Sequence, residues 1–151
     1  MITIKYSDIK GALIATISKL ELPVFYEDIN KIRRPCYYID LISYQKDFRS
    51  NYREFKQLDF DIMYFPKDKE GNNSETIEAL ENLDNNFEVA GNKILSILFE
   101  DKSLNRYLTL KDTRINIVDN VGHYEFYIDL FDVYGNPVDY QLMQELHLRR
   151  E

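Results

Sequence analysis

Two stretches of the chain carry apolar residues at the spacing of an amphipathic helix. In residues 6–20 the apolar side chains recur every three or four positions, and Pro23 prevents any continuation. A second stretch begins after Ser74, a favourable N-cap residue, and keeps the same spacing to about residue 99. The pattern therefore predicts two main helices, the second with a bend or split near residues 85–86.

Other segments alternate apolar and polar positions, as half-buried strands do. The alternation is clearest in residues 57–65 and 123–134, where every second side chain is apolar. Residues 36–44 are largely apolar on both faces, which is typical of a central strand. Shorter runs predict further strands at residues 24–27, 106–110 and 113–119.

The order of these elements predicts an α+β fold, with an antiparallel or mixed β-sheet and both main helices packed on one face. We interpret residues 36–65 as a long antiparallel hairpin that turns near residues 50–51, with a tip at residues 46–56 that projects beyond the sheet. A length of 151 residues suits one domain, residues 1–151. Residues 138–151 form an ambiguous tail that we expect to contact a neighbouring subunit.

Composition narrows the function classes. The chain has 26 acidic and 19 basic side chains, a net charge of −7, which argues against nonspecific coating of DNA. No apolar run is long enough to span a bilayer, and no signal peptide is recognisable, so we expect a soluble protein of a reducing compartment. Cys36 is the only cysteine and is expected to be a buried thiol.

Catalytic and cofactor motifs are missing from the sequence. No glycine-rich phosphate loop and no GxSxG nucleophile motif occurs. A short pattern resembles a magnesium-dependent nuclease, with Asp40 followed by Glu54 and Lys56. Charged residues make up 30% of the chain, so chance matches are common, and we favour exposed charges on the hairpin for Glu54 and Lys56.

Metal ligands are not found at recognisable spacings. His123, His147 and Cys36 do not form a zinc-like pattern along the chain. Asp59 and Asp61 share one strand face, which we interpret as a solvated outer face rather than a metal site. The sequence therefore predicts no catalytic, cofactor or metal site.

A basic segment interrupts this acidic chain. Residues 31–56 contain seven basic and three acidic side chains, a net charge of +4, and aromatic residues lie among them. Such a mixture suits a protein interface, with nucleic-acid binding and a merely solvated hairpin as the alternatives. The residues assigned to a subunit or tube interface are Lys46, Phe48, Arg49, Tyr52, Arg53, Phe55 and Lys56.

Four segments together resemble phage tail terminator proteins of contractile-tailed phages and of phage-tail-like particles of Gram-positive bacteria. These segments are SDIKGALIATISKL, CYYIDLISYQKDFRSNYREFKQLDFDIMYF, SETIEALENLDNNF…ILSILF and HYEFYIDLFDVYG. The resemblance covers nearly the whole chain as an order of elements. It includes no catalytic motif, because the family has none.

The resemblance implies a non-enzymatic virion protein, assembled in the bacterial host cytoplasm without a cofactor. Six copies would form a ring that caps the tail tube, stops its polymerisation and contacts the sheath and the head connector or collar. DNA would pass through the lumen without specific binding, and no membrane would be involved. A head–tail connector adaptor is the alternative within the same class, and the magnesium-dependent nuclease is the alternative from another class.

Overall fold

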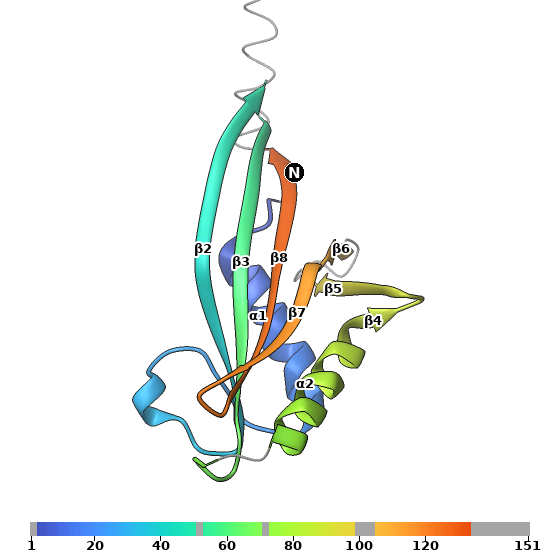
Figure 1. Cartoon of the computed structure of the whole chain (residues 1–151). Helices are drawn as coiled ribbons and strands as arrows, with labels where there is room; N and C mark the ends of the chain where they lie inside the picture. Colours follow the sequence, from blue (N-terminus) through green and yellow to red (C-terminus); the bar gives the residue numbers. More distant parts are fainter. Residues whose placement is uncertain (1–2, 51–52, 71–72, 99–104, 134–151) are drawn as a thin grey trace, which may run out of the picture.

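The computed structural model describes residues 3–50, 53–70, 73–98 and 105–133. Two α-helices, two short 3₁₀ helices and eight strands occur in this part of the chain (Figure 1). They are α1 (Tyr6–Ile17), η1 (Ser18–Leu20), β1 (Val24–Phe25), η2 (Ile29–Lys31), β2 (Cys36–Ser50), β3 (Arg53–Phe65), α2 (Asn73–Phe87), β4 (Glu88–Val89), β5 (Asn92–Leu98), β6 (Asn105–Thr109), β7 (Lys111–Val118) and β8 (Val121–Val133). The tail expected at residues 138–151 lies outside the described residues.

The main sheet has the strand order β1-β2-β3-β8-β7, and a smaller sheet has the order β4-β5-β6. All pairs are antiparallel except β1–β2. β1 pairs only with Tyr37 and Tyr38 of β2, so within the described residues the rest of β2 is an open edge of the sheet. The mixed sheet agrees with the predicted α+β class.

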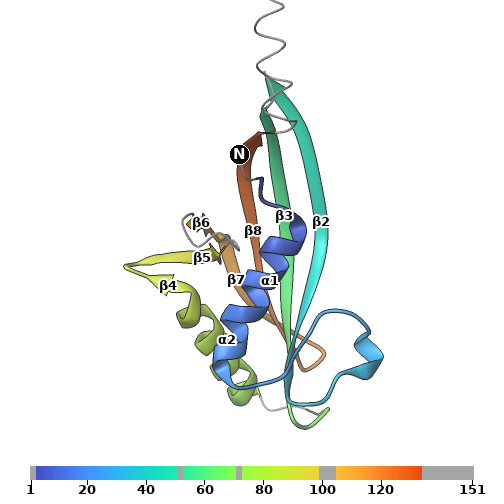
Figure 2. The ribbon, with the colours of Figure 1, turned by 180° about the vertical axis from the view of Figure 1, so that it is seen from behind.

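The side chains of β3 and β8 alternate as the sequence predicts. On β3 the even-numbered residues are buried, and on β8 Tyr124, Phe126, Ile128 and Leu130 are buried. These faces join the buried residues of α1 and α2 in one hydrophobic core. Figure 2 shows α1 in front of this side of the sheet, whereas Figure 1 looks onto the opposite, uncovered face. Ring contacts of Tyr6 with Phe60 and of Phe87 with Tyr124 confirm that both helices cover the same face.

The prediction that the second helix reaches residue 99 is wrong. The helix ends at Phe87, and residues 92–98 form β5. Ala90 and Gly91 have φ values of 50° and 86°, which reverse the chain between β4 and β5. Leu95 and Ile97 are then buried as alternate residues of a strand. The apolar residues of 92–98 fit both the helical period and the strand period, and the turn at Ala90 and Gly91 favours the strand.

The prediction that the hairpin tip at residues 46–56 projects beyond the sheet is also wrong. β2 and β3 pair from Cys36 opposite Phe65 to Ser50 opposite Arg53. β8 continues beside β3 as far as Val133, which lies opposite Arg53. The upper end of the sheet in Figure 1 therefore has three strands, β2, β3 and β8.

Three buried tyrosines attach the sheet to α2. The hydroxyl of Tyr37 donates to the carbonyl of Ala79 at 2.9 Å, and that of Tyr124 donates to Asp84 Oδ1 at 2.6 Å. Tyr64 donates to Glu75 Oε1 at 2.9 Å. Burial raises the pKa of Tyr37 to about 12. Burial, followed by the neighbouring carboxylates, also raises the pKa values of Tyr64 and Tyr124.

These shifts predict unfolding at alkaline pH. A tyrosine titrates near pH 10 in the unfolded chain, so below pH 10 its contribution to stability is complete. Between pH 10 and about 12 the folded Tyr37 stays protonated while the unfolded one ionises, so stability falls by up to about 1.4 kcal/mol per pH unit. Urea unfolding at several pH values measures this slope. Tyr37→Phe should reduce it, and Tyr107→Phe, at an exposed tyrosine, should not; equal slopes in all three chains would contradict the prediction.

Candidate functional site

A buried ion cluster lies at the end of the sheet where β2 and β8 end and β3 begins. Lys56 Nζ is 3.3 Å from Glu54 Oε1 and 3.3 Å from Asp132 Oδ2. The same ammonium donates to the carbonyl of Ile4 at 2.8 Å, and the N–H of Ile4 donates to Asp132 Oδ2 at 2.7 Å. The side chains of Lys56 and Asp132 are only 5% and 4% exposed. The cluster thereby fixes the segment before α1 to the sheet.

This burial corrects the expectation that Glu54 and Lys56 are exposed charges. Both are even-numbered residues of β3 and point to the helix-covered side, as Leu58 and Phe60 do. The interface that the sequence predicts on the hairpin also includes Lys56. Its ammonium group is instead used inside the subunit.

The nuclease constellation is not assembled. Asp40 lies opposite Asp61 in the β2–β3 ladder, on the uncovered face, whereas Glu54 and Lys56 lie on the helix-covered face. Glu54 and Asp61 are seven residues apart on β3, which is about 23 Å at ~3.3 Å per residue. Asp40 therefore cannot share a metal ion with Glu54 and Lys56.

The uncovered face of the main sheet is rich in carboxylates. Asp61 lies opposite Asp40 on one side and Glu125 on the other, so three acids form a row across β2, β3 and β8. Asp59 is half-buried and accepts a hydrogen bond from Ser43 Oγ at 2.7 Å. The predicted outer face is therefore correct for both aspartates. The expectation that Asp61 is solvated is wrong, because its side chain is buried.

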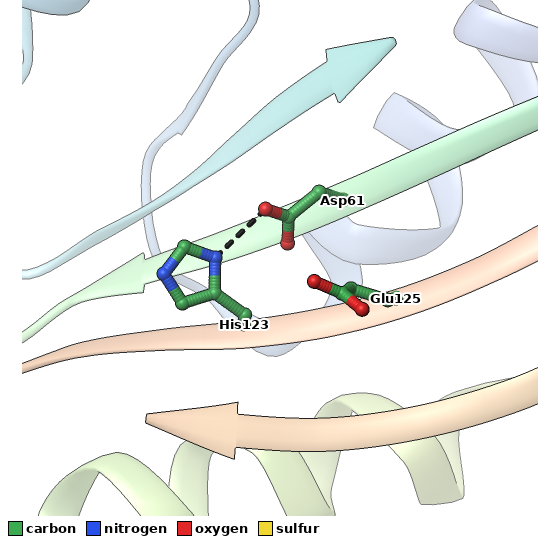
Figure 3. Close-up of side chains that lie close together, drawn as sticks. All are labelled: Asp61, His123 and Glu125. Atoms are coloured by element: carbon green, nitrogen blue, oxygen red, sulfur yellow. Dashed lines mark hydrogen bonds and ion pairs between the residues drawn. The ribbon is translucent and has the colours of Figure 1, made fainter. Parts of the chain in front are cut away.

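Asp61, His123 and Glu125 form a compact group on this face (Figure 3). His123 Nδ1 donates to Asp61 Oδ2 at 2.7 Å, and the imidazole lies beside the Asp61 carboxylate. Burial raises the pKa of Asp61, and the hydrogen bond from His123 opposes that rise. Arg114 forms an exposed ion pair with Glu125 at 3.1 Å. One nitrogen and two carboxylates thus come within 4.8 Å of one another.

Sequence reasoning missed this group because its spacing is defined across strands. Residues 61 and 123 are distant along the chain and adjacent only through the β3–β8 register. The alternation in β3 and β8 was visible in the sequence. The register between β3 and β8 could not be seen in the sequence. If one strand slid by two residues along the other, the same residues would stay buried, but every cross-strand pair would change.

Aromatic side chains are exposed where the three long strands end. We call this region the arm end and define it as residues 46–50, 53–56 and 130–133. Phe48 is 74% exposed and Phe131 is 60% exposed. The ring of Phe131 contacts that of Phe55, with centroids 5.2 Å apart. Lys46 and Arg53 add exposed positive charge, whereas Tyr52 and the side chain of Arg49 lie outside the described residues.

None of the described helices is long and apolar enough to cross a membrane.

The comparisons with known proteins identify a family. No curated protein matches the chain. The family model described as phage tail terminator protein matches residues 8–139, which is most of the chain. This family is one of structural proteins, so the chain has a structural role in tail assembly, as a component of the virion tail that interacts with other tail components. The match shows that the chain belongs to the phage tail terminator protein family.

Proposed function

We propose that this protein forms a closed ring at the head-proximal end of the tail tube, where it stops polymerisation of the tube. The ring joins the tube to the head connector or collar and, in a contractile tail, meets the sheath. Six copies are expected from the resemblance to contractile-tail terminators. The family match supports the structural role, and the exposed aromatic residues at the arm end are the observation that supports a contact there.

A ring needs two different contact surfaces on each subunit, because its interfaces are heterologous. The arm end exposes residues on both faces of the sheet. Lys46 and Phe48 lie on the side to which Lys56 and Glu54 point, and Arg53 and Phe131 lie on the opposite side. Full burial of one phenylalanine contributes about 1.5–3 kcal/mol, and exposed aromatic groups of this kind mark interaction sites. The partner is a neighbouring subunit or the tube.

Opposite charges favour such a contact. The segment of residues 31–56 carries +4 within a chain of −7, so the rest of the chain carries −11. The uncovered face of the main sheet concentrates part of that negative charge at Asp40, Asp59 and Asp129. Lys31, Arg33 and Arg34 precede β2 at the opposite end of the sheet, so at the arm end the exposed cations are Lys46 and Arg53. These two cations would favour the rate and register of association with such a face. Residues 138–151 are assigned to a further contact with the neighbouring subunit.

Electron microscopy of the purified protein mixed with the tail tubes of its source particle tests the proposal. A ring at one end of each tube, with tube length then fixed, is the expected result. Decoration along the tube, or no binding to the tubes, would reject the terminator role and favour the connector adaptor.

The double variant Phe48→Ser, Arg53→Ala should no longer cap tubes, because it removes an aromatic contact and a cation from the arm end. Both side chains are exposed, so the free energy of unfolding should change by about 0.5 kcal/mol or less per site. Ile29→Ser is the matched control, since Ile29 is exposed in η2 at the opposite end of the sheet (Figure 1). Normal capping by the double variant would remove the arm end from the proposal.

A further inference from the structure

The strongest unexplained feature of the molecule is a carboxylate oxygen on the uncovered face. Asp61 is more than nine-tenths buried, and among the described residues its Oδ1 has no hydrogen-bond partner. A buried polar atom left without a partner costs about 1–3 kcal/mol. Figure 3 shows that this oxygen points toward the carboxylate of Glu125 rather than away from it. Two carboxylates therefore face each other in a place where a cation would satisfy both.

The third member of the group supplies a nitrogen ligand. His123 Nδ1 lies 2.7 Å from Asp61 Oδ2. To bind a metal ion, Nδ1 would give up the proton of this hydrogen bond, and the neutral ring would carry its proton on Nε2. Asp61 and Glu125 are directly opposite in the β3–β8 ladder, and His123 is two residues before Glu125 on the same face of β8. All three side chains thus start from paired strands in the middle of a sheet, which holds their backbones in place.

We propose that Asp61, His123 and Glu125 bind a divalent transition-metal ion of the zinc type. One imidazole nitrogen and two carboxylates match the ligands of such ions, whereas Mg²⁺ and Ca²⁺ favour sites made of oxygen alone. Three protein ligands leave a fourth position for water or for a group from a partner.

The geometry needs only a small adjustment. The three ligand atoms lie within 4.8 Å of one another. Ligands about 2.1 Å from a tetrahedral ion are about 3.4 Å apart, so side-chain movements of roughly 1.4 Å or less complete the site. Arg114 must release Glu125, and its side chain is 74% exposed, so this ion pair contributes little to stability. The ion would also offset the repulsion in the row of Asp40, Asp61 and Glu125.

Calorimetric titration of the full chain with ZnCl₂ near pH 7.5 tests the site, with MgCl₂ as the comparison. We expect saturable binding of one Zn²⁺ per chain and much weaker binding of Mg²⁺. His123→Ala and Glu125→Gln should each reduce the affinity for Zn²⁺ at least tenfold. His147→Ala is the matched control, because it removes the other histidine of the chain and should leave the affinity unchanged.

A gain of affinity distinguishes this site from nonspecific binding. Arg114→Gln frees Glu125 from its ion pair and should tighten Zn²⁺ binding several-fold. Glu125→Gln keeps the size of the side chain and removes its charge. It therefore tests the Zn²⁺ site even if His123→Ala disturbs the fold. Absence of saturable Zn²⁺ binding, binding that survives Glu125→Gln, or binding that is lost in His147→Ala would each overturn the proposal.

Discussion

Replacement of Lys56 by methionine should lower the free energy of unfolding by about 3–5 kcal/mol, the usual cost of removing one partner from a buried ion pair. The ammonium group lies 3.3 Å from the carboxylates of both Glu54 and Asp132, and it also donates to the carbonyl of Ile4. Methionine has a similar length and leaves little cavity, so the loss reports the charge rather than packing. Arg106, at 3.8 Å from Asp132 and partly exposed, can offset only part of it. Urea unfolding followed by far-UV circular dichroism measures the change.

Lys46→Met is the matched control for this experiment. Lys46 lies directly opposite Lys56 in the β2–β3 ladder, but its side chain is exposed. Its replacement should therefore change the free energy of unfolding by no more than about 0.5 kcal/mol. Equal losses in the two variants would mean that the buried cluster does not stabilise the fold.

Gly122→Ala should destabilise the protein by about 1–3 kcal/mol, because α2 packs against the backbone of β8 at this position. A Cβ atom on residue 122 would lie 2.6 Å from Thr76 Cγ2 and 2.9 Å from Leu80 Cδ1. Both partners are buried side chains of α2, so the helix would have to move away from the sheet. Thermal and urea unfolding of the variant measure the loss.

Two further variants test whether contact with α2 is the cause. Gly11→Ala places the same methyl group on an exposed residue of α1 with nothing within 4 Å, and should stabilise the protein by about 0.5–1 kcal/mol. Thr76→Ser removes the nearest clashing atom, so Gly122→Ala with Thr76→Ser should lose less than the sum of the two single variants. If the losses of stability in the two single variants simply add up in the double variant, the loss in Gly122→Ala arises from the backbone of β8 and not from contact with α2.

The α+β class and the strand faces were predictable because they depend on local period. The alternation in β3 and β8 identifies the residues that face α1 and α2, among them Phe60 and Tyr124. The spacing of Ile9, Leu13 and Ile17 likewise identifies the buried side of α1. Burial of Cys36 followed from an apolar strand, and the structure confirms it.

Features that depend on cross-strand register could not be predicted. Lys56 looked exposed because a charged residue in a strand usually is, yet its partner Asp132 lies at the far end of β8 and is brought near only by pairing. The group of Asp61, His123 and Glu125 was missed for the same reason, because only the pairing of β3 with β8 brings these residues together. The end of α2 was missed for a different reason, since residues 92–98 fit both periods and the turn at Ala90 and Gly91 favours the strand.

The open edge of β2 makes the isolated subunit a potential template for uncontrolled aggregation. Beyond Tyr38, within the described part of the chain, the backbone groups on that edge have no neighbouring strand, and such edges add strands from other chains. Two features oppose indiscriminate addition. A bulge between Leu41 and Ser43 disturbs the straight run of the strand, and Lys46 places a charge farther along it. In a subunit that has not yet assembled, these two features disfavour pairing with arbitrary strands, while the edge stays accessible to a strand that fits it.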